Sequence, residues 1–170
     1  MILLVKKLLK GFPPLIGDKP TILILGSMPS VTSLEKQEYY GFAYNRFWRI
    51  LEHTYECELS NYEEKQQCIL NYHLGLWDVI AECEREGSLD SHIRNEKVND
   101  IKAILKTYPS IQRIICNGRK SYDLYQHYFI DVKIECLYLP STSNANRSMK
   151  EKKIFNLWND ALTKDLLDHK

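Results

Sequence analysis

The sequence predicts an α/β protein, in which a single three-layer α/β/α domain is built on a mainly parallel sheet of four strands. Residues 21–25, Thr-Ile-Leu-Ile-Leu, form an uninterrupted apolar run between Pro20 and Gly26. Such a run is typical of a strand buried on both faces of a parallel sheet. Strand-like and helix-like segments then alternate along the chain, a pattern that places helices on both faces of the sheet. The length of 170 residues is that of one domain with its own core.

Composition and charge narrow the class of protein. Apolar residues make up 44% and charged residues 26% of the chain, as in ordinary globular proteins, and no apolar run approaches the about 20 residues needed to span a bilayer. The net charge of +1 means that any DNA contact would come from local groups such as helix N-termini and backbone amides. The five cysteines form no Cys-x-x-Cys pair, which argues against a zinc site, an iron–sulfur cluster or a disulfide framework. We expect a cytoplasmic monomer with reduced thiols, without metal, cofactor or membrane association.

The N-terminal part is expected to lead into the first strand. Residues 1–170 are interpreted as one domain, with residues 1–10 as an N-terminal extension. Residues 1–5 are apolar, but they lack a preceding basic segment and a small-residue cleavage site, so we expect an extra turn or strand rather than a signal peptide. The first strand ends at Gly26, which permits a tight exit into a long loop. Asn45 is a favoured N-cap, so a helix should begin directly after that loop.

The middle of the chain mixes helical and extended patterns. Residues 62–71 are predicted to form a helix, and residues 74–80 break the helical period and predict the second strand with its exit. Ser88 is placed to cap a short turn over residues 90–93. A further helix is expected from residue 95 or 96 to 107. Its apolar stripe consists of Val98, Ile101, Ile104 and Leu105.

Two more strands and two more helices are predicted in the last third. Residues 111–116 predict the third strand, and Asn117-Gly118 opens a helix that runs to about residue 127. Residues 133–139 predict the fourth strand, and a polar loop follows over residues 140–147. The final helix carries its inward-facing side chains at Ile154, Trp158, Ala161 and Leu162.

Two loops, one rich in aromatic residues and one polar, are therefore predicted at one edge of the sheet. One runs from Gly26 to Asn45, and the other runs from Leu139 to Arg147. Each follows the carboxyl end of a strand, which is the edge where open α/β sheets bind ligands. The helix N-termini that follow the loops favour anions, and the tyrosines of the first loop suit a flat ring. We expect this edge to bind a nucleotide.

The motifs in these loops resemble those of the uracil-DNA glycosylase superfamily. They are Gly-Ser-Met-Pro-Ser at 26–30, Tyr-Tyr-Gly-x-x-x-Asn-Arg-Phe-Trp at 39–48 and Leu-Pro-Ser-Thr-Ser-x-Ala-Asn at 139–146. Within the superfamily the chain is most similar to the branch called hypoxanthine-DNA or deoxyinosine glycosylase. Residues 75–79, 87–91 and 117–118 also look like that branch. The resemblance covers nearly the whole chain from Gly11 onward and implies a fold like that of uracil-DNA glycosylase.

The resemblance also implies a catalytic residue. Many members of the superfamily have a catalytic Asp or Asn where Met28 stands, and a His where Leu139 stands. The hypoxanthine branch instead uses the Asn at the start of the next helix, and Asn45 matches it. Phe42-Ala43-Tyr44 replaces the more usual His-Pro-x before that position, and Asn144 replaces a common Pro. These departures bear on loop conformation and substrate preference.

Further residues are implied for base and DNA contacts. The residues implied for the base pocket are Ser27, Met28, Tyr40, Phe47 and Asp78. Those implied for DNA contacts are Pro29, Ser30, Ser141, Thr142, Ser143, Asn144 and Arg147. Residues 144–146 stand where the family inserts a wedge into the base stack. The alternative is that the polar residues of this loop cap the last helix and that Arg147 is a solvated surface group.

The chemistry of single residues leaves alternatives. Asn45 has a neutral amide, so it is not a general base; its carbonyl oxygen could hold a water, its NH₂ group could bind the base, or it could only be an N-cap worth about 1 kcal/mol. Tyr40 could stack on a flipped base, or it could anchor the loop to the core. Met28 could line the pocket or fill the core. Asp78 could accept a hydrogen bond from N1–H of hypoxanthine, or it could form a cap or salt bridge.

No side chain indicates a metal site or a covalent nucleophile. The five histidines are scattered without metal-ligand spacing. Arg119 and Lys120 open a helix and are interpreted as surface groups. We therefore expect no lysine in the crevice and no Schiff-base lyase reaction.

Together, the resemblance and the residues predict a monofunctional DNA glycosylase acting in base excision repair. It would hydrolyse the N-glycosidic bond of a deaminated base in DNA, with hypoxanthine favoured. A uracil-excising enzyme of the same superfamily is one alternative, because both bases present a carbonyl beside a ring N–H. A non-catalytic nucleotide- or DNA-binding module is another, because Met28 and Leu139 replace groups that are active in related enzymes. The expected partner is DNA containing a damaged base, in the cytoplasm and at the nucleoid.

Overall fold

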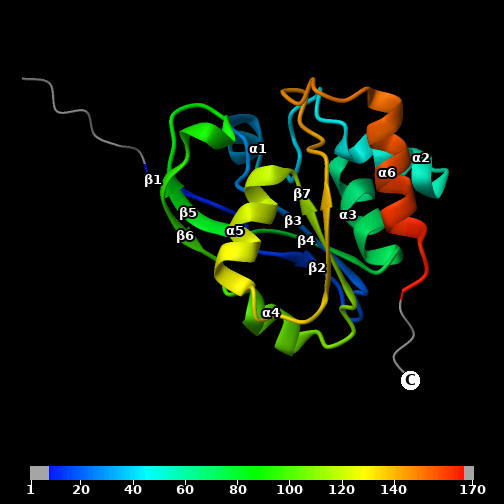
Figure 1. Cartoon of the computed structure of the whole chain (residues 1–170). Coiled ribbons are helices and arrows are strands. Elements are labelled where there is room, and N and C mark those ends of the chain that lie inside the picture. The colour runs from blue at the N-terminus through cyan, green and yellow to red at the C-terminus, as the bar shows by residue number, and fades with distance from the viewer. Residues whose placement is uncertain (1–7, 167–170) are drawn as a thin grey trace, which may run out of the picture.

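The central element of the computed structural model, which describes residues 8–166, is a five-stranded sheet in the order β2-β4-β3-β7-β8 (Figure 1). Its strands are β2 (Leu15–Ile16), β3 (Ile22–Gly26), β4 (Leu74–Asp78), β7 (Arg113–Asn117) and β8 (Glu135–Leu139). β3, β4, β7 and β8 run parallel, whereas β2 pairs antiparallel with β4 at one edge. The α/β fold class is confirmed. The sheet contains the four predicted parallel strands and, in addition, the short edge strand β2.

A second, antiparallel sheet lies beside the first. It has the order β1-β5-β6 and consists of β1 (Leu8–Lys10), β5 (Ile80–Glu84) and β6 (Arg94–Val98). The end of the predicted N-terminal extension thus forms β1, while residues 1–5 lie outside the described residues.

The helix predicted from residue 95 or 96 is wrong in its first part. Residues of β6 pair with β5, and the helix α4 (Ile101–Thr107) begins only after Asp100, whose Oδ1 accepts a hydrogen bond from Ala103 N at 3.0 Å. Val98 is partly buried and packs with the core as a strand residue. Because an apolar residue at this position fits both helical and extended periods, the local pattern did not separate the two.

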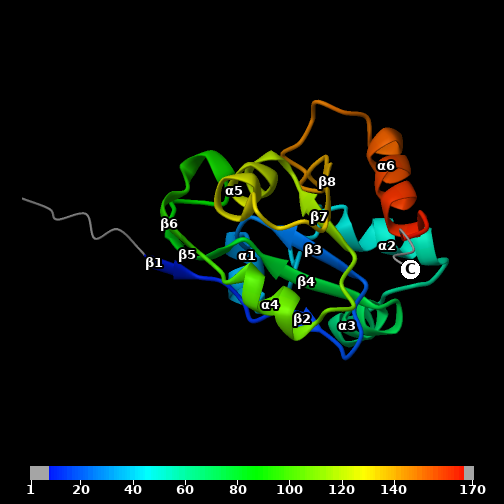
Figure 2. The same cartoon turned by 60° about the horizontal axis from the view of Figure 1, so that its bottom comes forward.

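The other helices are α1 (Val31–Lys36), α2 (Phe47–Tyr55), α3 (Tyr62–Asn71), α5 (Arg119–Phe129) and α6 (Glu151–Thr163). α3 has the predicted bounds. α2, α3 and α6 cover one face of the large sheet, and α4 and α5 cover the other, so that the molecule has three layers (Figures 1 and 2). None of the helices among residues 8–166 has the length and apolar character required to cross a bilayer.

Alternation along β3 assigns each side chain to one of the two cores. Ile22 and Ile24 pack in the cluster that contains Trp158 of α6, whereas Leu23 and Leu25 pack in the cluster that contains α4 and α5 residues. Successive strand residues point to opposite faces, and both faces are covered here. Full burial of each such side chain contributes roughly 1.5–3 kcal/mol. The four side chains predicted to point inward from the last helix are all buried.

The long loop predicted after Gly26 is partly helical. Ser30 caps α1, because its Oγ accepts a hydrogen bond from Ser33 N at 3.1 Å, and the helix ends after six residues. Ser88, predicted to cap the turn at residues 90–93, instead accepts a hydrogen bond from Val31 N at 2.9 Å, while the turn Asp90–His92 begins after Leu89. The carboxyl ends of the parallel strands thus face loops that contact one another.

Candidate active site

A cleft of about 900 Å³ lies at the carboxyl edge of the parallel strands. Its walls are formed by the segment after β3, the turn near residue 90, the start of α5 and the loop after β8. In Figure 1 the loops after β3 and β8 meet at the top of the molecule. All the residues predicted for the site line this cleft except Phe47 and Arg147. The two loops predicted to meet at one sheet edge therefore do so.

The ring of Tyr40 forms part of the cleft wall and rests on Phe47. The two ring centroids lie 4.1 Å apart with 28° between the planes, and the Tyr40 hydroxyl accepts a hydrogen bond from Asn117 Nδ2 at 3.3 Å. Phe47 itself is 0% exposed. Its prediction as a base-pocket residue is corrected: as the first residue of α2 it points into the core and supports Tyr40 from behind. Tyr39, in contrast, is buried and donates its hydroxyl to Pro13 O at 2.7 Å.

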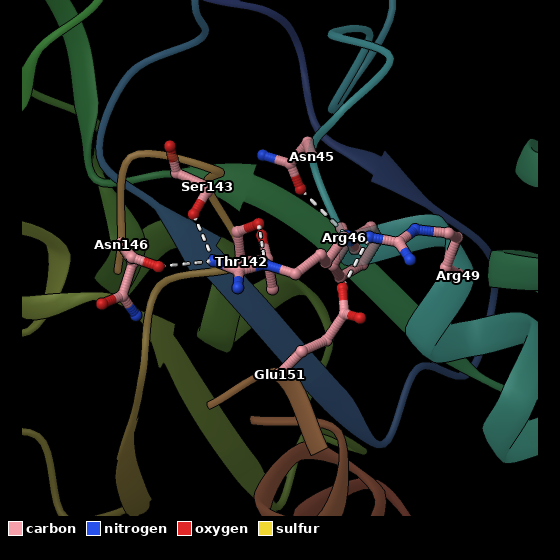
Figure 3. A network of polar contacts seen from close by, with 8 residues as sticks. Asn45, Arg46, Arg49, Thr142, Ser143, Asn146 and Glu151 are labelled. Carbon is pink, nitrogen blue, oxygen red and sulfur yellow. Dashed lines mark hydrogen bonds and ion pairs between the residues drawn. The ribbon is translucent and has the colours of Figure 1, made fainter. Parts of the chain in front are cut away.

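Asn45 stands at the start of α2 and faces the cleft. Its Oδ1 accepts a hydrogen bond from Phe47 N at 2.9 Å, which is the interaction of a helix cap (Figure 3). A backbone N–H requires an acceptor, so this bond fixes which end of the amide faces the helix. The Nδ2 group makes no hydrogen bond among residues 8–166. Asn45 thus caps the helix and presents an NH₂ group at the cleft at the same time.

Asp78 ends β4 at the floor of the cleft. Its side chain is buried, with 5% exposure of the residue, and Oδ2 has no hydrogen-bond partner among the described residues. Burial, together with the negative charge of Asp90, raises the pKa of Asp78 to about 7, against a lowering effect of Arg85. A Cβ atom on Gly26 would lie 2.5 Å from Asp78 Oδ1, so only glycine leaves room for this carboxyl group.

Asp90 lines the same cleft as Asp78 and acts on it electrostatically, whereas from the sequence it was expected only as part of a turn. Ser27 donates its hydroxyl to Asp90 Oδ1 at 2.6 Å. Burial raises the pKa of Asp90, and the hydrogen bond from Ser27 acts in the opposite direction. Arg85 is buried near both carboxyl groups and donates from Nη2 to Pro29 O at 2.7 Å. No local pattern signals these partners, because Ser27 and Asp90 are 63 residues apart.

Asn117 joins the two walls of the cleft. Its Oδ1 accepts from Thr142 N at 3.0 Å, and its Nδ2 donates to Thr142 Oγ1 at 3.0 Å as well as to Tyr40. Thr142 is 1% exposed. The prediction that Thr142 contacts DNA is therefore corrected, because its side chain is buried and its N–H is already donated to Asn117 Oδ1. From the sequence, Asn117 was predicted only to open a helix. Its position as a polar residue at the carboxyl end of a parallel strand is the signal that could have indicated its place in the site.

The rest of the loop after β8 lies at the surface. Ser141 Oγ accepts a hydrogen bond from Ser143 N at 3.2 Å, and Asn144 is exposed on the cleft rim. Arg147 is exposed and lies outside the cleft lining. The buried guanidinium of Arg46 reaches this loop from the start of α2 (Figure 3). No local pattern in the sequence indicates this role of Arg46, because its partners lie about 100 residues further along the chain.

Two cations interpreted as surface groups also line the cleft. Arg119 and Lys120 begin α5 beside the site. The Arg119 guanidinium lies 4.4 Å from the ring centroid of Tyr138, close enough for a cation–π contact. The expectation that no lysine stands in the crevice is therefore wrong, because α5 begins directly after β7 at the carboxyl edge of the sheet and its first turn lines the cleft. Among residues 8–166 no group of three or more His, Cys, Asp or Glu side chains is placed to hold a metal ion.

Known proteins match this chain along most of its length. Residues 13–163 match the family model of the uracil DNA glycosylase superfamily. Proteins named hypoxanthine DNA glycosylase from Methanosarcina acetivorans and Methanosarcina barkeri are 38% and 36% identical, over 85% of this chain and 92% of each relative. A solution NMR structure from Methanosarcina acetivorans, described as a candidate uracil DNA glycosylase, superimposes with a TM-score of 0.82 at 37% identity, over 92% of this chain and 97% of that one. The chain therefore belongs to the uracil DNA glycosylase superfamily.

Proposed function

We propose that the protein is a monofunctional DNA glycosylase that removes hypoxanthine from DNA and thereby starts base excision repair. The observation that carries this proposal is the convergence of Asn45, Tyr40 and Asp78 on one cleft. The two similar proteins named hypoxanthine DNA glycosylase support it. The target nucleotide would leave the duplex and enter the cleft.

Asn45 is the proposed catalytic residue. Hydrolysis of the glycosidic bond gives the sugar cationic character, and the base departs with negative charge. The Nδ2 group of Asn45, oriented by the capping bond from Phe47 N to Oδ1, would donate to the departing base. A donor that is oriented before the reaction needs no rearrangement in the transition state, which is why one such group commonly contributes a factor of about a hundred to a thousand in rate. The second lone pair of Oδ1 remains available to a water.

Asp78 is the residue proposed to recognise the base by hydrogen bonds. Hypoxanthine presents N1–H and the carbonyl O6 side by side. A neutral carboxyl group can accept from N1–H with one oxygen and donate to O6 with the other. An ionised carboxylate could only accept, and it would repel a base that departs as an anion. The raised pKa of Asp78 keeps a substantial share of this group neutral near pH 7.

The contacts to DNA would come from local groups, because the net charge is +1. We propose Ser30, Ser141, Ser143 and Asn144 on the rims of the cleft as phosphate contacts, with Pro29 beside them. Few cations are involved, so affinity for undamaged DNA should be modest and its salt dependence shallow.

The test is a glycosylase assay with the purified chain. Labelled duplexes that contain one hypoxanthine, one uracil or neither are incubated with the protein and analysed with and without alkali treatment. We expect cleavage of the hypoxanthine strand only after alkali, because a monofunctional enzyme leaves an abasic site intact. Cleavage of the uracil strand alone would assign the substrate to uracil. Strand breaks without alkali would implicate a lyase reaction by a cleft lysine, and cleavage of neither duplex by a folded, DNA-binding protein would indicate a binding module.

A further inference from the structure

We infer that Arg46 is a positioning residue that holds the loop of residues 141–146 in its DNA-binding form. The inference rests on the proposed function in one respect, namely that the cleft binds DNA. Arg46 follows the proposed catalytic residue directly in the chain. Hydrogen bonds from its side chain link the start of α2 to the loop on the opposite rim of the same cleft.

Four hydrogen bonds connect Arg46 to the loop (Figure 3). Its backbone N–H donates to Thr142 O at 2.9 Å, and its Nε donates to the same oxygen at 3.2 Å. Nη2 donates to Ser143 O and, at 3.0 Å, to Asn146 O. The side chain thus binds the backbone carbonyl groups of three loop residues. Among residues 8–166, no residue of α2 itself makes a hydrogen bond to this loop.

Arg46 is 8% exposed, and no carboxylate of the described residues lies within ion-pair distance of its guanidinium. A buried guanidinium without hydrogen bonds would be strongly destabilising. Here backbone carbonyl oxygens supply the acceptors, which makes the conformation of the loop a condition for burying this side chain. The arrangement is specific to arginine, since the ammonium of lysine is a single point charge and cannot span separated carbonyl groups with a planar fork.

The peptide units held by Arg46 explain how it would prepare a DNA site. In a trans peptide the C=O of one residue and the N–H of the next point in opposite directions. Because the carbonyl groups of Ser143 and Asn146 point to Arg46, the N–H groups of Asn144 and Arg147 point away from it. Neither N–H group donates a hydrogen bond within residues 8–166. Outward-facing amides of this kind bind phosphate oxygens without net charge.

Arg49 provides a matched control on the same helix. Its side chain is 51% exposed and pairs with Glu151 at 2.9 Å, and it makes no hydrogen bond to the loop of residues 141–146 among the described residues. Removal of Arg49 deletes one positive charge near the same rim. A comparison of Arg46 and Arg49 variants therefore separates the loss of a positive charge from the loss of the hydrogen bonds between Arg46 and the loop.

The experiment compares wild type, Arg46→Met, Arg46→Lys and Arg49→Met in single-turnover cleavage of a hypoxanthine duplex at increasing enzyme concentration. We expect Arg46→Met to raise the half-saturating enzyme concentration about tenfold or more, while the rate at saturation changes by less than about threefold, because the loop grips DNA and does not touch the reacting atoms. Arg46→Lys should resemble Arg46→Met, and Arg49→Met should stay within about twofold of wild type. A further variant, Arg46→Ala, leaves the place of the guanidinium group empty. Guanidinium chloride below denaturing concentration, with NaCl matched in the control, should therefore restore DNA binding by this variant.

Three results would overturn the inference. These are equal effects of Arg46→Met and Arg49→Met, wild-type affinity of a folded Arg46→Lys protein, and absence of guanidinium rescue in a folded Arg46→Ala protein. If Arg46→Met fails to fold, Arg46→Lys and the rescue decide the question. If the wild-type protein cleaves no substrate, the proposed function fails separately, and the same variants are compared by fluorescence anisotropy on undamaged duplex DNA.

Discussion

The ring of Tyr40 lies on the ring of Phe47, with 4.1 Å between the centroids. Phe47 is fully buried, so one face of Tyr40 is covered by the core and only the remainder of the ring can meet a ligand. The hydroxyl is held by Asn117. Tyr40 is therefore fixed from two sides before any base enters the cleft, which lowers the entropy cost of stacking on it.

Replacement of the Tyr40 ring should weaken binding of a flipped base. Stacking on an aromatic ring contributes about 1–3 kcal/mol per base, so Tyr40→Leu should raise the half-saturating enzyme concentration on hypoxanthine DNA by roughly tenfold to a hundredfold. Tyr40→Phe keeps the ring and loses only a 3.3 Å hydrogen bond, so its change should be less than about fivefold. Single-turnover kinetics and thermal melting measure both effects. A folded Tyr40→Leu protein with wild-type affinity would show that Tyr40 only anchors the loop.

Substitutions of Asn45 distinguish catalysis from capping. Asn45→Ala removes both functions and should lower the single-turnover rate by about a hundredfold to a thousandfold and stability by about 1 kcal/mol. Asn45→Asp keeps an acceptor for Phe47 N, so stability should stay near that of wild type, while the lost NH₂ donor keeps the rate as low as in Asn45→Ala. Cleavage assays and denaturant unfolding provide the two readouts. Wild-type activity of Asn45→Asp would reduce Asn45 to a helix cap.

The rate on hypoxanthine should fall as pH rises above about 7. The neutral form of Asp78 is the proposed partner of the base, and the pKa of about 7 means that this form is lost as pH rises through that value. The expected slope is up to about tenfold per pH unit. Asp78→Asn offers a permanent donor and acceptor, so it should remain active and lose this alkaline decline. A pH profile of Asp78→Asn that matches that of wild type would remove Asp78 from the base-reading role.

The free energy of unfolding, like the rate on hypoxanthine, should decrease with rising pH because of Asp78. The pKa of Asp78 is about 7 in the folded protein and about 3.9 when unfolded, so between these values the folded state binds more protons. The free energy of unfolding should therefore decrease as pH rises from about 4 to about 7, by an amount on the order of 4 kcal/mol from this group. Denaturant unfolding across this range measures the effect. Asp78→Asn should remove most of the decrease, and an unchanged decrease in that variant would assign it to other groups.

Gly26→Ala should disturb the floor of the cleft. The new Cβ would lie 2.5 Å from Asp78 Oδ1 and 3.3 Å from the Tyr40 hydroxyl, so the Asp78 carboxyl group must move. We expect a stability loss of about 1–3 kcal/mol and a marked loss of activity. The double variant Gly26→Ala/Asp78→Ala should recover part of that stability, because the clashing group is absent. Additive effects in the double variant would contradict the proposed clash.

Local sequence was sufficient for the parallel strands and for much of the site. The run at residues 21–25 lies between Pro20 and Gly26, and both of its faces are covered by helices. A strand that is buried on both faces can be recognised from its own residues, because nearly all of them are apolar. The order of the motifs predicted the superfamily, and this prediction is confirmed. Asn45 and Tyr40 reached the cleft because loops after parallel strands share one edge of the sheet.

Tertiary structure alone decided which groups act as partners. Val98 fits a helix or a strand by period, and pairing with β5 selects the strand. Ser27 meets Asp90 across 63 residues, and Arg46 meets Ser143 across 97. Contacts of this kind depend on how the chain crosses over between strands, and that information is not contained in any short window of sequence. The sequence by itself therefore determined the four parallel strands, the family and the candidate catalytic residue. The raised pKa of Asp78 and the hydrogen bonds from Arg46 to the loop of residues 141–146 follow from burial and long-range packing.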